Sequence, residues 1–160
     1  MAIQVGDKIP SVGLMTMGAD GPEPVDPGTY FAGKKVVVFS VPGAFTPTCS
    51  AKHLPGFVNQ IDAIKAKGVD AVACLSVNDP FVMGAWAKDQ GADGKVDMLA
   101  DGSAKFTTAL GLELDLIERG LGMRGQRFAM IVEDGTVTDL AVEEAGDFSV
   151  SSAEAILAKL

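Results

Sequence analysis

VVVFSVPGAFTPTCSAKHLPGF, residues Val36–Phe57, is the stretch that decides the fold of this chain. Its first part, Val36–Val41, is short and almost wholly apolar, which is typical of a strand buried on both faces. Pro42 and Gly43 end this strand, because proline cannot donate to a sheet ladder and glycine frees the backbone. The sequence therefore predicts a buried strand followed by a tight turn.

A helix is predicted directly after the turn. The hydroxyl groups of Thr46 and Thr48 are placed to cap it, and Pro47 suits its first turn. Apolar residues then recur at helical spacing until Gly68. They are Ala51, Leu54, Phe57, Val58, Ile61 and Ile64. Cys49 is therefore predicted to lie in the first turn of a helix of about four to five turns.

The position of Cys49 favours a chemical role. Unpaired backbone N–H groups and the helix dipole place partial positive charge beside the sulfur, which favours the reactive thiolate. Most free cysteines are instead small, buried, apolar residues. Because the residues just before Cys49 are polar turn formers, we predict a reactive thiol at this position.

Three sequence blocks resemble one protein family. The Pro-x-x-x-Thr-x-x-Cys pattern of residues 42–49 resembles the peroxiredoxin active-site pattern. The longer string PGAFTPTCSAKHLPGF is similar to the atypical branch that includes the mammalian type 5 and plant type II enzymes. SVNDPFVMGAWAK (76–88) and RFAMIVEDG (127–135) resemble the same branch. The resemblance covers nearly the whole chain, and three long blocks in the right order are not expected by chance.

The resemblance implies a thiol-specific peroxidase with a thioredoxin-like α/β fold. The Cys49 thiolate would attack hydrogen peroxide or an alkyl hydroperoxide and become a sulfenic acid. Thr46 and Arg127 would orient the peroxide and stabilise the leaving oxygen, and Pro42 would shield the sulfur from bulk water. No metal, haem or flavin cofactor is implied, because cysteine itself does the redox chemistry.

Arg127 is also singled out by its own surroundings. It opens an otherwise apolar segment, RFAMIV. Negative charge that develops on a departing oxygen requires positioned donors and a fixed positive charge. The residues alone leave a solvent-exposed arginine at a strand end as the alternative. Arg124 is the second candidate, and the resemblance favours Arg127 because it directly precedes the aromatic residue of RFAM.

His53 is the only histidine and follows Cys49 by one helical turn. A Cys–His pair would suit a cysteine hydrolase with histidine as general base. Both residues on one helix are unlike the usual separated arrangement, and no nearby Asn or Asp obviously orients the ring. The resemblance places His53 beside the pocket as a neighbour. A metal site is disfavoured, because Cys49, His53 and Cys74 lack compact ligand spacing.

Cys74 has two interpretations. In VDAVACLSV its neighbours are apolar on both sides, which is typical of a buried, inert thiol. The resemblance to plant type II enzymes, which have a cysteine at the matching place, implies a resolving residue that condenses with the sulfenic acid on Cys49. That bridge needs Cα atoms within about 7 Å and would require the first helical turn to unwind. Otherwise glutathione or glutaredoxin would reduce the sulfenic acid directly, and thioredoxin is a further candidate reductant.

The mammalian type 5 enzyme has its resolving cysteine near the C-terminus. The corresponding stretch of this chain, residues 144–152, contains no cysteine, so that arrangement does not apply.

Composition predicts one domain, residues 1–160, with a sizeable core, because 48% of the residues are hydrophobic. The net charge of −8 disfavours binding to nucleic acids and anionic membranes. No apolar run approaches the about 18 residues of a membrane helix, and the N-terminus lacks a signal-peptide pattern. Two cysteines without a disulfide framework predict a cytoplasmic location. The resemblance implies a non-covalent homodimer with Pro80 and Phe81 near the contact.

The other expected elements alternate between strands and helices. Strands are expected at residues 9–17, 69–77, 96–100, 128–132 and 137–142, helices at 81–88 and 104–110, a loop with a possible hairpin at 19–30, and an irregular stretch at 112–124. Asn78, Asp79 and Pro80 are expected to begin the helix at 81–88, and Glu133-Asp134-Gly135-Thr136 is a hairpin signal between the last two strands. Ser151-Ser152-Ala153-Glu154 is interpreted as a capping box that opens the last helix. This order predicts a mixed sheet with helices on both faces.

Two other classes of protein are weaker alternatives. A dithiol–disulfide oxidoreductase normally has C-x-x-C, and here Thr46 occupies the first of those positions. A non-enzymatic redox sensor or holdase needs little more than one reactive thiol.

Overall fold

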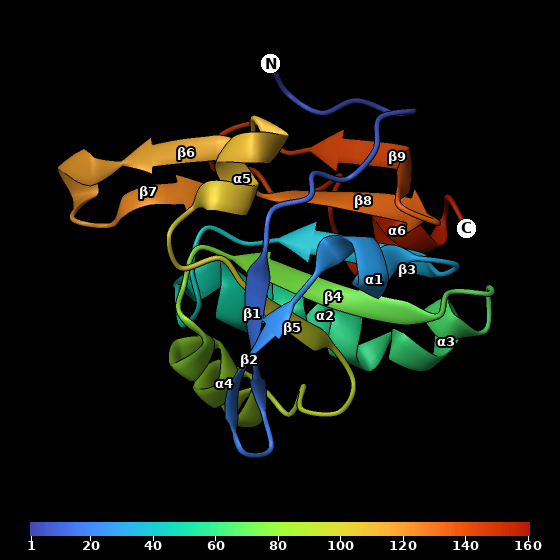
Figure 1. Ribbon diagram of the computed structural model, residues 1–160, viewed down its shortest axis with the longest axis horizontal. Helices are drawn as coiled ribbons and strands as arrows, with labels where there is room; N and C mark the ends of the chain where they lie inside the picture. Colours follow the sequence, from blue (N-terminus) through green and yellow to red (C-terminus); the bar gives the residue numbers. More distant parts are fainter.

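A seven-stranded mixed sheet runs through the computed structural model, which describes residues 1–160 (Figure 1). The strand order is β2-β1-β5-β4-β3-β8-β9, and β3–β4 and β4–β5 are the parallel pairs. The strands are β1 (Leu14–Gly18), β2 (Gly21–Val25), β3 (Lys35–Ser40), β4 (Ala71–Ser76), β5 (Asp97–Ala100), β8 (Phe128–Glu133) and β9 (Thr136–Val142). The thioredoxin-like α/β fold that the sequence predicted is confirmed.

Helices cover both faces of the sheet. Figure 1 shows α1 (Pro27–Phe31) and α5 (Lys105–Leu110) on the near side of the sheet and α2 (Leu54–Asn59) on the far side. The far side also carries α3 (Ile61–Lys65), α4 (Pro80–Asp89) and α6 (Ala153–Leu157), whose apolar residues share one core with α2.

The central strand β3 contributes to both cores, as its apolar run predicted. Val36 and Val38 pack in the core under α1 and α5, whereas Val37 and Phe39 pack in the core under α2, α3, α4 and α6. All four side chains are buried. Because successive residues of a strand point to opposite faces, a strand between two helical layers must be apolar at every position.

The helix after Cys49 is less regular than its spacing predicted. Residues Cys49–His53 form a π-helical turn, and the helix then breaks at Gln60 into α2 and α3. The Leu54 N–H donates five residues back to the Cys49 carbonyl. Pro55 follows and has no N–H to donate, so the chain lacks a donor for the narrower α-helical turn. Cys49 thus starts a wide turn, a geometry common at functional sites.

The stretch 112–124, expected to be irregular, forms a second small sheet. Strands β6 (Glu113–Leu116) and β7 (Gly122–Gly125) pair antiparallel around the 3₁₀ turn Ile117–Arg119, and the hairpin projects from the body in Figure 1. The alternation of ELDL, residues 113–116, is the strand signal that the glycine content obscured.

The predicted caps and the β8–β9 turn have mixed outcomes. Asp79 caps α4 by accepting a hydrogen bond from the Val82 N–H at 2.9 Å. Asp134 and Gly135 take positive φ angles of 48° and 78°, as a two-residue hairpin requires. The capping box was off by one residue, because Ser152 rather than Ser151 accepts from the Ala155 N–H of α6.

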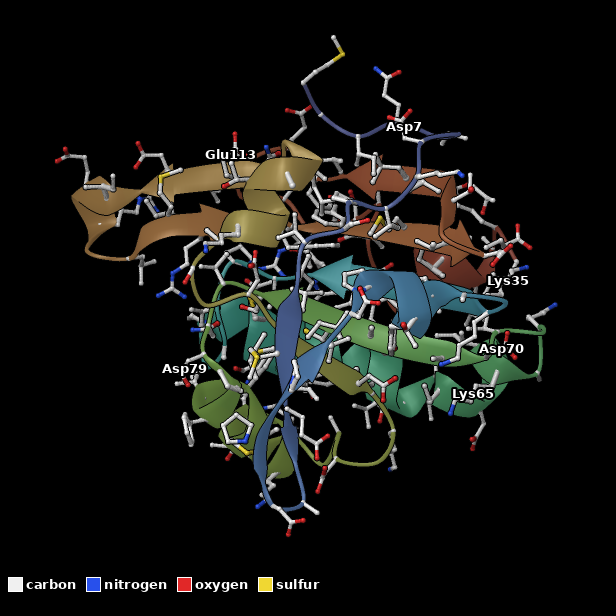
Figure 2. All side chains as sticks on the ribbon, viewed as in Figure 1. Asp7, Lys35, Lys65, Asp70, Asp79 and Glu113 are labelled. Carbon is white, nitrogen blue, oxygen red and sulfur yellow. The ribbon has the colours of Figure 1, made fainter.

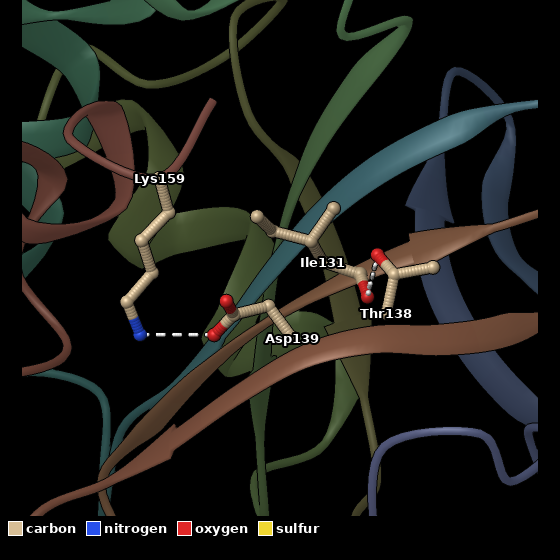
Figure 3. A network of polar contacts seen from close by, with 4 residues as sticks. All are labelled: Ile131, Thr138, Asp139 and Lys159. Carbon is tan, nitrogen blue, oxygen red and sulfur yellow. Dashed lines mark hydrogen bonds and ion pairs between the residues drawn. The ribbon is translucent and has the colours of Figure 1, made fainter.

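Most charged groups lie on the outside of the fold, and the buried carboxylates of Asp101 and Glu143 are the exceptions. Figure 2 shows labelled side chains such as Lys65 and Asp79 projecting outward, and the Asp70 carboxylate accepts from the Lys35 N–H at 2.8 Å. The single ion pair, Lys159 to Asp139 at 2.9 Å, ties the C-terminus to β9 beside the contact between Thr138 and Ile131 (Figure 3). None of the helices has the length and apolar character needed to cross a membrane.

Candidate active site

The loop between β3 and the π-helical turn is held by local hydrogen bonds. The Thr46 hydroxyl donates to the Gly43 carbonyl at 2.7 Å, and the Asn78 side-chain oxygen accepts from the Ala44 N–H at 3.0 Å. A Cβ at Gly43 would lie 2.9 Å from a guanidinium nitrogen of Arg124 and 3.2 Å from the Thr46 methyl group, so these two side chains pack closely over the loop. These contacts fix the loop against the end of β4.

The Cys49 side chain is fully buried, with 0% exposure. The polar residues before Cys49 had argued against a small, buried thiol, but the π-helical turn directs the side chain into the core that also contains Phe57 and Trp86. The sulfur is nevertheless not in a purely apolar setting. Arg127 donates a hydrogen bond from Nη2 to Cys49 Sγ at 3.1 Å. The guanidinium therefore places a positive charge and an N–H donor directly against the sulfur.

Arg127 binds two partners with one guanidinium. While Nη2 contacts Cys49, Nη1 lies 2.8 Å from His53 Nδ1, and the Phe148 ring lies 5.8 Å from Cζ. The planar group has a fixed fork geometry, so holding one nitrogen positions the other. Arg124 does not reach the sulfur; its Nη1 donates to the Pro42 carbonyl at 3.4 Å.

His53 is held from both sides of its ring. Its Nε2 lies 2.9 Å from the Ser151 carbonyl oxygen, which can only accept, so Nε2 carries the hydrogen and Nδ1 is left to accept from Arg127. Burial lowers the pKa of His53 to about 3, and the charge of Arg127 acts in the same direction. A neutral ring whose free lone pair already binds Arg127 is poorly suited to be a hydrolase general base.

A small cavity of about 160 Å³ opens next to Arg127. Its other lining residues are mostly polar and come from three segments of the chain. They are Pro42 and Thr48, Leu114 and Gln126, and residues 143–147. Cys49 and Thr46 are not among the lining residues, and Arg127 is the lining residue that contacts the Cys49 sulfur.

Cys74 lies in the middle of the sheet. It pairs with Phe39 of β3 and Met98 of β5, is fully buried, and shares the core of Cys49. Burial raises the pKa of its thiol well above the usual value, and the neighbouring Cys49 adds to the effect. Both cysteines are free in this structure. In this conformation Cys74 has the properties of a core thiol.

Four residues of the site have no clear sequence signal. Ser151 acts through its backbone carbonyl, and Phe148 packs its ring against His53 with centroids 5.0 Å apart. Asn78 was noted only as a helix start, and Glu143 was not singled out. A contact made by a backbone atom or across a loop of unknown path leaves no residue pattern to detect.

The chain is similar to known proteins over nearly its whole length. The sequence model of the Redoxin family matches residues 4–157. Peroxiredoxin-2C of Oryza sativa subsp. japonica is 52% identical over 159 residues, which cover 99% of this chain and 98% of the rice protein. Peroxiredoxin-2E, chloroplastic, of Arabidopsis thaliana is 47% identical over 163 residues, which cover 99% of this chain and 70% of the Arabidopsis protein. The crystal structure of reduced Prx3 in complex with H₂O₂ from Vibrio vulnificus superposes with a TM-score of 0.95 at 52% identity and covers 98% of each chain.

Proposed function

The chain belongs to the peroxiredoxins, within the redoxin family, and we propose that Cys49 is the residue at which it reduces peroxides. As a peroxiredoxin similar to the plant type 2 proteins, it is a thiol peroxidase with an antioxidant function. The observation that carries the proposal for Cys49 is the 3.1 Å hydrogen bond from the Arg127 guanidinium to its sulfur. Cys74, the other thiol, has no such partner.

The proposed reaction begins with the Cys49 thiolate. Its sulfur attacks one oxygen of the peroxide, the O–O bond breaks, and the departing oxygen takes a proton to leave as water or an alcohol. The sulfur is oxidised to a sulfenic acid while the peroxide is reduced by the same two electrons. The titratable groups beside the sulfur do not include a basic histidine, so we infer that the departing oxygen takes its proton from solvent in the cavity.

The neighbouring residues have distinct proposed roles. Arg127 holds the thiolate and offers N–H groups to the oxygen that gains charge. The Thr46 hydroxyl already donates to Gly43, so its oxygen is left to accept a hydrogen bond from the peroxide. Pro42 has no N–H and lines the cavity mouth, where it shields the sulfur. His53 keeps the Arg127 guanidinium in place.

Recycling of the sulfenic acid has two proposed routes. In the first, glutathione or glutaredoxin attacks the Cys49 sulfur, water leaves, and a second thiol releases the reduced enzyme. The burial of Cys74 within β4 favours this route. In the second, Cys74 displaces water to form a disulfide, which thioredoxin or another dithiol then reduces. The shared core of the two cysteines favours this second route, and so does the position of Cys49 in a π-helical turn rather than in a regular α-helix.

Two variants test the assignment of the cysteines. We expect Cys49→Ser to abolish hydrogen peroxide consumption with every reductant. Cys74→Ala, chosen because serine would bury a hydroxyl without a partner, should keep turnover with glutathione and glutaredoxin. Full turnover in Cys49→Ser would end the proposal, and loss of all turnover in folded Cys74→Ala would favour the disulfide route.

Domain organisation, assembly and location are further proposals. One sheet draws strands from Leu14 to Val142, which supports a single domain over residues 1–160. Phe45 and Phe81 are 53% and 65% exposed. A contact with a second copy of the chain would bury these two rings, which supports a non-covalent homodimer. Sedimentation of the parent chain and of Phe81→Asp tests the dimer, because a dimeric parent would become monomeric in the variant, whereas a monomeric parent would not change.

Two free cysteines support a cytoplasmic location, although a relative is chloroplastic. Imaging of the tagged chain tests this location.

A further inference from the structure

A nearly buried carboxylate, that of Glu143, follows β9 and makes no ion pair. Glu143 is 7% exposed, and the only ion pair of the molecule joins Lys159 to Asp139. Its Oε2 instead accepts three hydrogen bonds from one short segment. The donors are the Ser149 N–H at 2.7 Å, the Ser151 N–H at 2.9 Å and the Ser151 hydroxyl at 2.7 Å.

These bonds outweigh the cost of burial. Burial alone would raise the pKa of Glu143, but the hydrogen bonds from Ser151 and its neighbours hold that pKa below the usual range. Three bonds to one charged oxygen fix the path of residues 149–151, because each charge-assisted bond is stronger than a neutral one. Glu143 therefore fixes the position of the Ser151 backbone.

The Ser151 backbone is what holds His53. Its carbonyl accepts from His53 Nε2 at 2.9 Å, and this sets which ring nitrogen carries the hydrogen. His53 Nδ1 then accepts from Arg127 Nη1 at 2.8 Å, and the second arm of the fork donates to the Cys49 sulfur at 3.1 Å. A continuous set of contacts thus runs from Glu143 to the reactive sulfur.

We propose that Glu143 is a positioning residue for the peroxidase reaction. Its hydrogen bonds to residues 149–151, which we call the clasp, hold Ser151 so that Ser151 orients His53. His53 in turn orients Arg127 against Cys49. The proposal rests on the function proposed above. Glu143 touches neither the peroxide nor the sulfur and acts through the loop it holds.

A purely electrostatic role for Glu143 would have the opposite sign. Glu143 lines the same cavity as Arg127, and a negative charge there disfavours a second negative charge on the sulfur. If that field were its main effect, removal of the carboxylate would make Cys49 more reactive. If the clasp is its main effect, removal would make Cys49 less reactive, because Arg127 would lose its fixed position.

The test compares five variants by kcat/KM for hydrogen peroxide. Glu143→Ala removes every acceptor, and we expect a loss of about 10-fold or more, since small misplacements of a catalytic group have effects of that size. Glu143→Gln keeps one oxygen acceptor without the charge and should retain activity within about 3-fold. Glu133→Ala is the matched control, because this exposed glutamate lies at the opposite end of the β8–β9 hairpin.

The last two variants, His53→Ala and the double variant His53→Ala/Glu143→Ala, separate the clasp from general destabilisation. In a His53→Ala background the further change Glu143→Ala should alter kcat/KM by less than about 2-fold, because the contact through which it acts is already lost. His53 is the only histidine, so its ring ¹⁵N shifts report its tautomer directly. We expect the Nε2–H form in the parent chain and a mixture of tautomers in Glu143→Ala.

Three results would overturn the proposed positioning role of Glu143. The first is a kcat/KM of Glu143→Ala at or above that of the parent, and the second is an unchanged His53 tautomer in Glu143→Ala. The third is full additivity of the Glu143→Ala and His53→Ala effects on kcat/KM. If Glu143→Ala does not fold, Ser151→Ala removes one of the three donors and enters the same cycle, with the same non-additivity expected. Failure of the proposed function shows differently, as turnover that survives Cys49→Ser. An inactive Cys49→Ser with an unaffected Glu143→Ala would reject the clasp alone.

Discussion

Replacement of Arg127 by alanine removes the only cation that contacts the Cys49 sulfur. The change deletes the 3.1 Å bond to Sγ and the 2.8 Å bond to His53 Nδ1. A hydrogen bond to a charged group contributes about 1.5–3 kcal/mol. Since about 1.4 kcal/mol corresponds to a factor of ten, loss of the bond to the sulfur alone should lower kcat/KM for hydrogen peroxide by roughly 10- to 100-fold.

The single tryptophan provides the assay. Trp86 Nε1 donates to the Ser50 hydroxyl at 3.0 Å, and Ser50 directly follows Cys49. Stopped-flow fluorescence should therefore follow oxidation of Cys49 without an added label. Arg127→Lys keeps the charge but not the fork, so we expect a rate between those of the parent and Arg127→Ala.

Arg124→Ala is the matched control for this prediction. Arg124 also lies beside the Pro42 loop, but it binds backbone carbonyls rather than the sulfur. Its loss should change the oxidation rate by less than about 3-fold. The reasoning would be refuted by an Arg127→Ala rate close to that of the parent, or by an equal loss in Arg124→Ala.

Three further predictions concern stability. His53 has a pKa of about 6.5 in the unfolded chain and about 3 in the folded one, so the unfolded state binds the proton more readily. The unfolding free energy should therefore decrease by up to about 1.4 kcal/mol per pH unit as the pH falls from about 6.5 towards 3. Urea titrations of the parent and of His53→Gln at several pH values measure this decrease. Asp79→Ala removes the side-chain cap on the Val82 N–H of α4 and should destabilise the fold by about 1 kcal/mol in urea, with an unchanged midpoint as the contrary result. Lys159→Met breaks the exposed pair with Asp139, and thermal unfolding should show a change of less than about 0.5 kcal/mol; a larger loss would mean that this pair anchors α6 (Figure 3).

The sequence was sufficient wherever local chemistry decides the structure. The apolar run of β3, the Asp134–Gly135 turn and the Asp79 cap each follow from the preferences of a few adjacent residues. The position of Cys49 at a strand–helix junction follows from the same kind of pattern. These features needed no knowledge of distant contacts.

The sequence was insufficient where a contact joins distant segments. His53 and Ser151 are far apart along the chain, and the link uses a backbone carbonyl that every residue has. The burial of Cys49 also depends on the wide turn before Pro55, which spacing alone does not distinguish from a regular helix. Periodicity therefore predicted the helix but not the path of the loop that completes the site.

The central claim is that peroxide oxidises the Cys49 sulfur. Its most direct test is the mass of Cys74→Ala after reaction with one equivalent of hydrogen peroxide and a dimedone trap, followed by peptide mapping. Without Cys74 no internal disulfide can form, so a sulfenic acid on Cys49 must persist long enough to react with the trap. The account predicts one dimedone adduct, on the peptide that contains Cys49. An unmodified Cys49 after the peroxide is consumed would contradict it.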